Sequence, residues 1–132
     1  MANLADPTHW ETSILRATGR LLMLAALEER PGHGYDLARR LSGLCGSWCH
    51  PSPAMIYPAI RELEAAGLVH CDDEPSDPRG RRVCHLTDAG REALAVGLTA
   101  WGRFLPVLER LVAGTTGPCE AGRAADSKEC GP

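Results

Sequence analysis

Two cysteines and a histidine stand close together at one point of the sequence. Three residues separate Cys45 from Cys49, and His50 follows directly. Two thiols and an imidazole suit a soft ion such as zinc, copper(I), mercury(II) or arsenite, so a soft metal ion at Cys45 and Cys49 is the candidate cofactor. Oxidation of the pair to a disulfide is a second interpretation, and burial as small apolar side chains is a third. The spacing leaves all three open.

Cys71 and Cys84 form a second pair, and each lies beside a histidine, His70 or His85. For this pair we favour simple burial, because cysteine is among the most buried residue types. The chain has six cysteines, and its first residues lack the basic segment and apolar stretch of a secretory signal. We therefore expect a cytoplasmic protein whose cysteines are free thiols, metal ligands or redox switches rather than structural disulfides.

Arg79, Arg81 and Arg82 surround Gly80 and form the clearest basic cluster. The net charge of the chain is −3, so a nucleic-acid-binding surface has to be a local patch of this kind. Arginines around a turn glycine suit insertion into a minor groove or contact with the DNA backbone. The alternative is a solvated loop in which the arginines pair with acids of the same segment. Those acids are Asp72, Asp73, Glu74 and Asp77.

The elements that position these groups follow from helix boundaries and apolar spacing. The 132 residues are enough for one domain. Thr8 and Glu11 have the spacing of a capping box, which predicts a helix that runs to about Glu29. Pro31 and Gly32 end it.

A second, shorter helix is predicted to open at residues 33–37 and to end at Gly43 and Gly46. Leucines at steps of four and three give it one buried stripe. The stripe consists of Leu37, Leu41 and Leu44.

A third helix is predicted to start at Ser52, a hydroxyl cap, with Pro53 at its first position, and to end at Gly67. Its core residues are Ile56, Ile60 and Leu63. On a helical wheel, the opposite face is mostly small, which allows close approach to a groove floor. That face holds Ala54, Pro58, Arg61 and Ala65, and Met55 and Tyr57 flank it.

Two short strands are predicted at residues 68–71 and 82–86, joined by an acidic loop at residues 72–80. Thr87 and Asp88 then open a last helix with an apolar heptad seam. The seam consists of Leu94, Leu98, Trp101, Leu105, Leu108 and Val112. A seam of this length predicts a partner helix, so we expect a homodimer.

Three helices, a hairpin and a long helix predict a mainly α fold, a winged helix-turn-helix with a C-terminal dimerisation helix. The third helix is then the recognition helix and the hairpin the wing. The segments are an N-terminal extension (1–18), the DNA-binding domain (19–90), the dimerisation helix (91–113) and a disordered tail (114–132). The candidate DNA contacts are Ser52, Ala54, Met55, Tyr57, Arg61, Arg79, Arg81 and Arg82.

Several of these segments resemble the PadR family of bacterial transcriptional regulators, in its shorter C-terminal branch. The similar segments are residues 33–37, 51–53, 56–58, 63–69, 80–82 and 86–91. The resemblance covers about Leu21 to Leu94 and implies a homodimeric winged-helix repressor. The two-fold symmetry of such a dimer predicts a palindromic operator in double-stranded DNA.

The resemblance carries over Ser52, Tyr57 and the wing arginines as DNA contacts, whereas Arg61 rests on the helical wheel. The chain departs from the family at Ala54 and Met55, where a Gly or Ser and then a Thr are usual. It also has Cys84 where the second wing strand of the family tends to carry an aromatic residue. The operator sequence therefore cannot be borrowed from relatives.

The signal that releases DNA is open between a small molecule, a metal ion and a thiol-redox change. Trp101 lies on the predicted dimer seam, and Trp10 lies on the first helix. Two copies of Trp101 across a two-fold axis can sandwich a small planar effector, and the resemblance includes members that respond to phenolic or planar molecules. The alternative is that both tryptophans are core residues.

A rival class is a cysteine-based metal-handling or thiol-redox protein on a winged-helix scaffold, acting through Cys45 and Cys49. The sequence shows no general base or oxyanion site, so we expect that the protein is not an enzyme. We expect no membrane partner either, because no apolar run approaches the roughly 20 residues of a membrane span.

Overall fold

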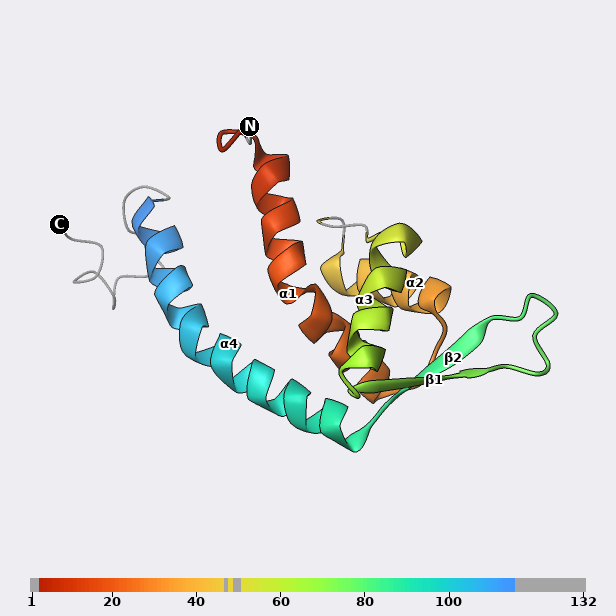
Figure 1. Cartoon of the computed structure of the whole chain (residues 1–132). Coiled ribbons are helices and arrows are strands. Elements are labelled where there is room, and N and C mark those ends of the chain that lie inside the picture. The colour runs from red at the N-terminus through yellow and green to blue at the C-terminus, as the bar shows by residue number, and fades with distance from the viewer. Residues whose placement is uncertain (1–2, 47, 49–50, 116–132) are drawn as a thin grey trace. The chain divides into compact units, whose positions relative to one another are not determined.

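The computed structural model describes residues 3–46, 48 and 51–115, which form a mainly helical fold with one antiparallel hairpin (Figure 1). The elements are α1 (Pro7–Glu29), α2 (Gly34–Cys45), α3 (Pro53–Ala65), β1 (Val69–Asp73), β2 (Arg82–Leu86) and α4 (Asp88–Thr115). This is the predicted order of elements. The chain divides into two compact units, Met1–Ala95 and Val96–Pro132. Within the described ranges, none of the helices has the length and hydropathy that a membrane span requires.

The cap of α1 differs from the predicted one. Asp6 precedes the helix in extended backbone, and its carboxylate accepts a hydrogen bond from the backbone N–H of Thr8 at 3.0 Å. Pro7 takes the first helical position, where a missing N–H leaves no helical hydrogen bond unmade. Asp6 therefore replaces Thr8 as the cap, whereas the helix ends at Glu29 as predicted.

The last turn of α2 departs from its predicted burial. Leu37 and Leu41 are buried as predicted, but Leu44 is 62% exposed. The prediction was wrong for Leu44 because the buried face of α2 reaches no further than Leu41, so the final turn extends past the core. Gly43 also lies inside the helix, and the chain leaves it only at Gly46.

α3 has the predicted boundaries and core face. Ser52 is the N-cap residue, and its backbone carbonyl accepts the first helical hydrogen bonds, but its hydroxyl makes no capping hydrogen bond. Ile56, Ile60 and Leu63 are buried, as predicted. Gly67, at φ +78°, turns the chain out of the helix toward β1.

One apolar core joins α1, α2, α3, the hairpin and the first turns of α4. Its buried residues are Met23, Leu24, Ala26, Leu27, Leu37, Ala38, Leu41, Ile56, Ile60, Leu63, Val69, Cys71, Cys84, Leu86 and Leu94. The membership of Leu94 corrects the predicted seam, because this side chain is 3% exposed and packs within its own chain. The exposed part of the seam begins at Leu98.

The hairpin pairs Cys71 of β1 directly with Cys84 of β2, and a disulfide joins the two side chains. Burial of this pair was predicted correctly, but the expectation of free thiols rather than disulfides was wrong. The antiparallel register supplies the physical reason. Gly32 exchanges both backbone hydrogen bonds with Cys84, at 2.8 and 3.1 Å. The two cysteines therefore face each other at a non-hydrogen-bonded position, where side chains lie closest.

Thr87 connects the end of α3 to the start of α4. Its hydroxyl donates to the carbonyl of Gly67 at 2.7 Å and accepts from the N–H of Gly90 at 3.0 Å. A Cβ atom at Gly90 would come within 2.2 Å of the carbonyl oxygen of Leu68. Glycine is thus required where the first turn of α4 crosses the strand entry. The predicted disordered tail falls mostly outside the described residues.

Candidate nucleic-acid interface

The exposed side of α3 borders two separate hollows. The first, the α1 groove, has a volume of about 460 Å³ and is lined mainly by apolar side chains of α1 and α3, including Leu15, Ala54 and Met55. The second, the wing hollow, has a volume of about 310 Å³ and lies between α3, the start of α2 and the hairpin. Its lining includes Tyr57, Arg61, Glu64, Arg81, Arg82 and the Cys71–Cys84 pair.

Seven of the eight predicted DNA contacts are divided between these two hollows, and Arg79 lines neither. Tyr57, Arg61, Arg81 and Arg82 line the wing hollow. Ser52, Ala54 and Met55 line the α1 groove. All the α3 contacts among them are exposed, as the helical wheel requires. The structure thus brings four of the eight residues together around one hollow, among both charged and apolar side chains.

The ring of Tyr57 lies against the backbone of Gly34 at the start of α2. A Cβ atom at Gly34 would come within 2.4 Å of a ring carbon, so any larger residue there displaces the tyrosine. The tyrosine is nevertheless 41% exposed. Its position is therefore fixed from one side while it stays available to a partner on the other. Sequence reasoning missed this contact, although Gly34 belongs to a motif that it singled out.

Arg81 is held by the loop between the strands. Its Nε donates to a carboxylate oxygen of Asp77 at 2.5 Å, and the other carboxylate oxygen of Asp77 accepts from the backbone N–H of Arg79 at 2.8 Å. The backbone hydrogen bond from Arg79, followed by the hydrogen bond from Arg81, lowers the pKa of Asp77 below its usual 3.8. Of the four acids that the solvated-loop alternative offered, Asp77 makes the closest ion pair with a wing arginine.

Arg82 spans from the hairpin to α3. Its guanidinium donates to Glu64 at 3.0 Å and to the backbone carbonyl of Cys71 at 2.6 Å. A carboxylate oxygen of Asp73 lies 4.0 Å from its Nε. Part of the hydrogen-bonding capacity of Arg82 is therefore used within the protein, where it fixes the wing against α3.

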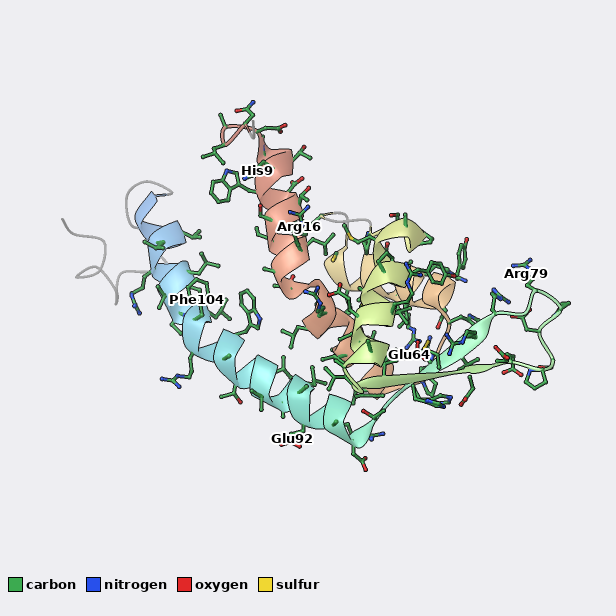
Figure 2. The ribbon with its side chains drawn as sticks, viewed as in Figure 1. His9, Arg16, Glu64, Arg79, Glu92 and Phe104 are labelled. Atoms are coloured by element: carbon green, nitrogen blue, oxygen red, sulfur yellow. A yellow bond between two sulfur atoms is a disulfide. The ribbon has the colours of Figure 1, made fainter. Side chains whose placement is uncertain are left out.

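Arg61 and Arg79 are the two predicted contacts whose guanidinium groups are exposed and, among the described residues, make no ion pair or hydrogen bond. Figure 2 shows Arg79 at the tip of the hairpin, away from the helices. Arg61 lines the wing hollow, whereas Arg79 does not. Exposed guanidinium groups at either place suit phosphate oxygens, which they can bind with two donors at once.

His33 is a further residue of this site that sequence reasoning missed. It precedes α2 as the N-cap residue and lines the wing hollow. Its Nδ1 atom is buried and has no hydrogen-bond partner among the described residues. The histidine also adds an electrostatic contribution to the lowered pKa of Asp77.

The described residues of the predicted metal or redox site and the two predicted ligand-binding tryptophans do not line the wing hollow. Cys45 ends α2, and Cys49 and His50 lie outside the described residues. Within the described part of the chain, no three metal-binding side chains come together. Trp10 is exposed and donates its indole N–H to the carbonyl of Leu4 at 2.7 Å. Trp101, in the other unit, packs edge-on against Phe104 with ring centroids 6.0 Å apart.

Three helices followed by a two-stranded hairpin, with a hollow lined by arginines between the third helix and the hairpin, define a winged helix-turn-helix protein. A family model described as the transcriptional regulator PadR-like family matches residues 23–96. The chain belongs to this family of transcriptional regulators.

Comparisons with individual proteins agree with this assignment. A curated relative, the transcriptional regulator Rv3488 of Mycobacterium tuberculosis, is 38% identical over 79 residues, which cover 60% of this chain and 71% of the relative. The structure of a PadR family regulator from Eggerthella lenta is similar with a TM-score of 0.69 and 24% identity, covering 80% of this chain and 90% of the other. Bacillus subtilis PadR in complex with operator DNA has a TM-score of 0.54 and 21% identity, covering 60% and 44%.

Proposed function

We propose that the protein is a homodimeric repressor that binds a palindromic operator in double-stranded DNA. The observation that carries this proposal is the wing hollow, where Tyr57 and Arg61 of α3 face Arg81 of the hairpin segment. A solved relative with this fold holds operator DNA. We expect a regulator of this kind to act on chromosomal DNA in the cytoplasm and to catalyse no reaction.

The proposed binding mode places α3 in a major groove and the wing against the adjacent backbone. The small exposed residues Ala54 and Pro58 allow the helix to approach the groove floor. Arg61 lies further along α3, within reach of a guanine edge or a phosphate, and Arg79 at the hairpin tip contacts phosphate. Met55, if it reaches a base, supplies apolar contact to a thymine methyl group.

Dimerisation is supported by the exposed apolar residues of α4. Leu105, for example, is 52% exposed, and several exposed apolar side chains along one helix mark an interaction surface. The exposed positions of the seam are spaced by seven, three and four residues, as in a heptad repeat that faces a helical partner. They are Leu98, Leu105, Leu108 and Val112.

We also propose that a small planar effector releases the protein from DNA. Trp101 lies in the seam region of α4, where a two-fold axis would place it near its copy, and Trp10 offers an exposed indole on α1. A small planar effector bound between two copies of Trp101 is expected to quench tryptophan fluorescence. Titration of a panel of phenolic compounds, with Trp101→Phe and Trp10→Phe as controls, tests this part.

DNA binding is tested by fluorescence anisotropy on the DNA upstream of the coding sequence, across a series of salt concentrations. Replacement of Arg61 and Arg79 by alanine removes two phosphate-binding groups, so the logarithmic salt slope is expected to fall by about 2 and the affinity with it. Arg103→Ala, which removes an exposed arginine of α4, is the matched control. Unchanged binding by the double variant contradicts the proposed interface.

A further inference from the structure

The Cys71–Cys84 disulfide lies where the proposed DNA surface meets the protein body. Both cysteines line the wing hollow together with Arg61, Arg81 and Arg82. Both cysteines are buried, 4% and 3% exposed, and the wing hollow that they border is the side from which a small reductant would have to reach them. Of the arginines around this hollow, Arg81 and Arg82 are paired with carboxylates, and Arg61 is the one whose positive charge favours a thiolate, the reactive form of cysteine in exchange with a disulfide.

The backbone of Cys71 is linked to α3 through the side chain of Arg82. Arg82 donates to the carbonyl of Cys71 at 2.6 Å and to the carboxylate of Glu64 at 3.0 Å. On the other strand, the backbone of Cys84 is fixed by Gly32. A change in the distance between the two cysteines therefore moves a strand that is hydrogen-bonded, through one guanidinium group, to the helix proposed to read DNA.

We propose that Cys71 and Cys84 form a reversible thiol–disulfide site that sets the affinity for DNA, an inference that rests on the proposed function. A small dithiol reduces the site in two steps. One thiolate of the dithiol attacks a sulfur of the disulfide, which forms a mixed disulfide and releases one cysteine thiolate. The second thiol of the dithiol then attacks the mixed disulfide, which releases the other cysteine and leaves the dithiol as a cyclic disulfide. The two protons and two electrons of the dithiol end on Cys71 and Cys84. Hydrogen peroxide reverses the reaction: the two thiols become the disulfide, and two molecules of water leave.

The oxidised form is the tighter DNA binder in this proposal. A two-stranded hairpin is marginally stable by itself, and the disulfide fixes the base of the wing beside α3. Reduction releases this constraint and allows the wing a wider range of positions, which weakens binding. Since DNA on α3 and the wing covers the hollow, bound DNA protects the disulfide from the reductant.

The test uses the full chain with Cys45, Cys49, Cys119 and Cys130 replaced by serine, so that the response is confined to the pair. Alkylation by iodoacetamide and intact mass measure the thiol state, and anisotropy on the DNA upstream of the coding sequence measures affinity. The oxidised protein is expected to take up no label, and the protein reduced by dithiothreitol two labels. Reduction is expected to raise the Kd roughly fivefold, and peroxide to restore it.

A second comparison keeps the four other cysteines, in case their replacement by serine prevents folding. Wild type is compared with Cys71→Ala/Cys84→Ala, which is expected to lose the part of the dithiothreitol response that the pair causes. Saturating DNA is expected to slow reduction of the disulfide roughly fivefold or more.

Three results overturn the proposal: labelling of Cys71 or Cys84 in the oxidised protein, equal DNA affinity of the two forms, or an unchanged response in the double alanine variant. Failure of the proposed function gives a different pattern. In that case neither the oxidised nor the reduced form binds DNA at low salt, and the proposed effect of the disulfide on DNA affinity is rejected as well. The mass measurement then decides whether the disulfide is reduced and re-formed.

Discussion

Arg82 of β2 and Glu64 of α3 form an ion pair at 3.0 Å, which joins the wing to the third helix across 18 positions of sequence. The pair is partly exposed, with a coupling energy of about 0.5 kcal/mol expected for such a site. The ion pair positions the wing relative to α3, because the same guanidinium group also donates to the carbonyl of Cys71.

The coupling between Arg82 and Glu64 is measurable by a double-mutant cycle. We expect Arg82→Gln and Glu64→Gln to show an interaction free energy of about 0.5 kcal/mol in urea denaturation, reduced by salt. Arg79→Gln with Glu64→Gln is the matched control, since Arg79 lies at the hairpin tip (Figure 2), and its interaction energy is expected to be near zero. Equal values in the two cycles contradict the role of Arg82 as a connection to α3.

Gly34→Ala tests the contact between α2 and Tyr57. The new methyl group meets the tyrosine ring, so we expect a loss of about 1–3 kcal/mol in the free energy of unfolding. Gly43→Ala is the control in the same helix, where nothing lies within 4 Å of the added Cβ. That substitution is expected to stabilise the protein by about 0.5–1 kcal/mol. Stabilisation by both substitutions excludes the tight packing of the ring.

Leu105→Glu/Leu108→Glu tests the apolar surface of α4. Two charges on adjacent turns oppose burial against a partner helix, so we expect a dimer to become a monomer in light scattering coupled to size exclusion. Val96→Glu places a charge on an exposed position outside the steps of the seam and is expected to leave the mass unchanged. A monomeric wild-type protein would rule out the dimer from the start.

The hydrogen bonds of Asp77 predict a pH dependence of stability. The folded protein holds the pKa of this carboxyl below its usual 3.8, so in the pH window between the two values the unfolded chain binds more protons. The contribution of Asp77 to stability is therefore complete above that window and is lost as pH falls through the folded value. Urea denaturation from pH 6 down to acid is expected to show a smaller loss of stability for Asp77→Asn than for wild type. Parallel curves for the two proteins exclude this carboxyl as a source of acid sensitivity.

The periodic parts of the fold were predictable from the sequence, because they depend on local signals. Pro53 after Ser52 marks the start of α3, and burial of Ile56 and Ile60 follows from their spacing. The structure departs from the predictions where contacts that the local pattern does not show determine the cap of a helix or the burial of a side chain. The cap of α1 moved to Asp6, whose carboxylate reaches the N–H of Thr8. Leu94 joined the core although it continues the heptad seam, because α4 begins against the body of its own chain.

The sequence pointed to the residue types of the candidate site, whose role in DNA binding stays a prediction, but not to the ion pairs that these residues make. The sequence indicated a basic wing, yet it did not reveal that Arg81 is held by Asp77 and Arg82 by Glu64, since these ion pairs depend on the hairpin register. The disulfide depends on the same register. Local patterns indicate two strands, but a shift of one residue would have placed the two cysteines on opposite faces of the hairpin.

At the level of the two cysteines, both edges of the hairpin are already occupied. Gly32 takes both backbone groups of Cys84 on one side, and Arg82 takes the outward carbonyl of Cys71 on the other. A sheet edge with its hydrogen-bonding groups engaged does not recruit another strand. If two copies bind one stretch of DNA as proposed, their wings are therefore expected to stay separate at their bases instead of merging into a continuous sheet, which leaves association between copies to helices.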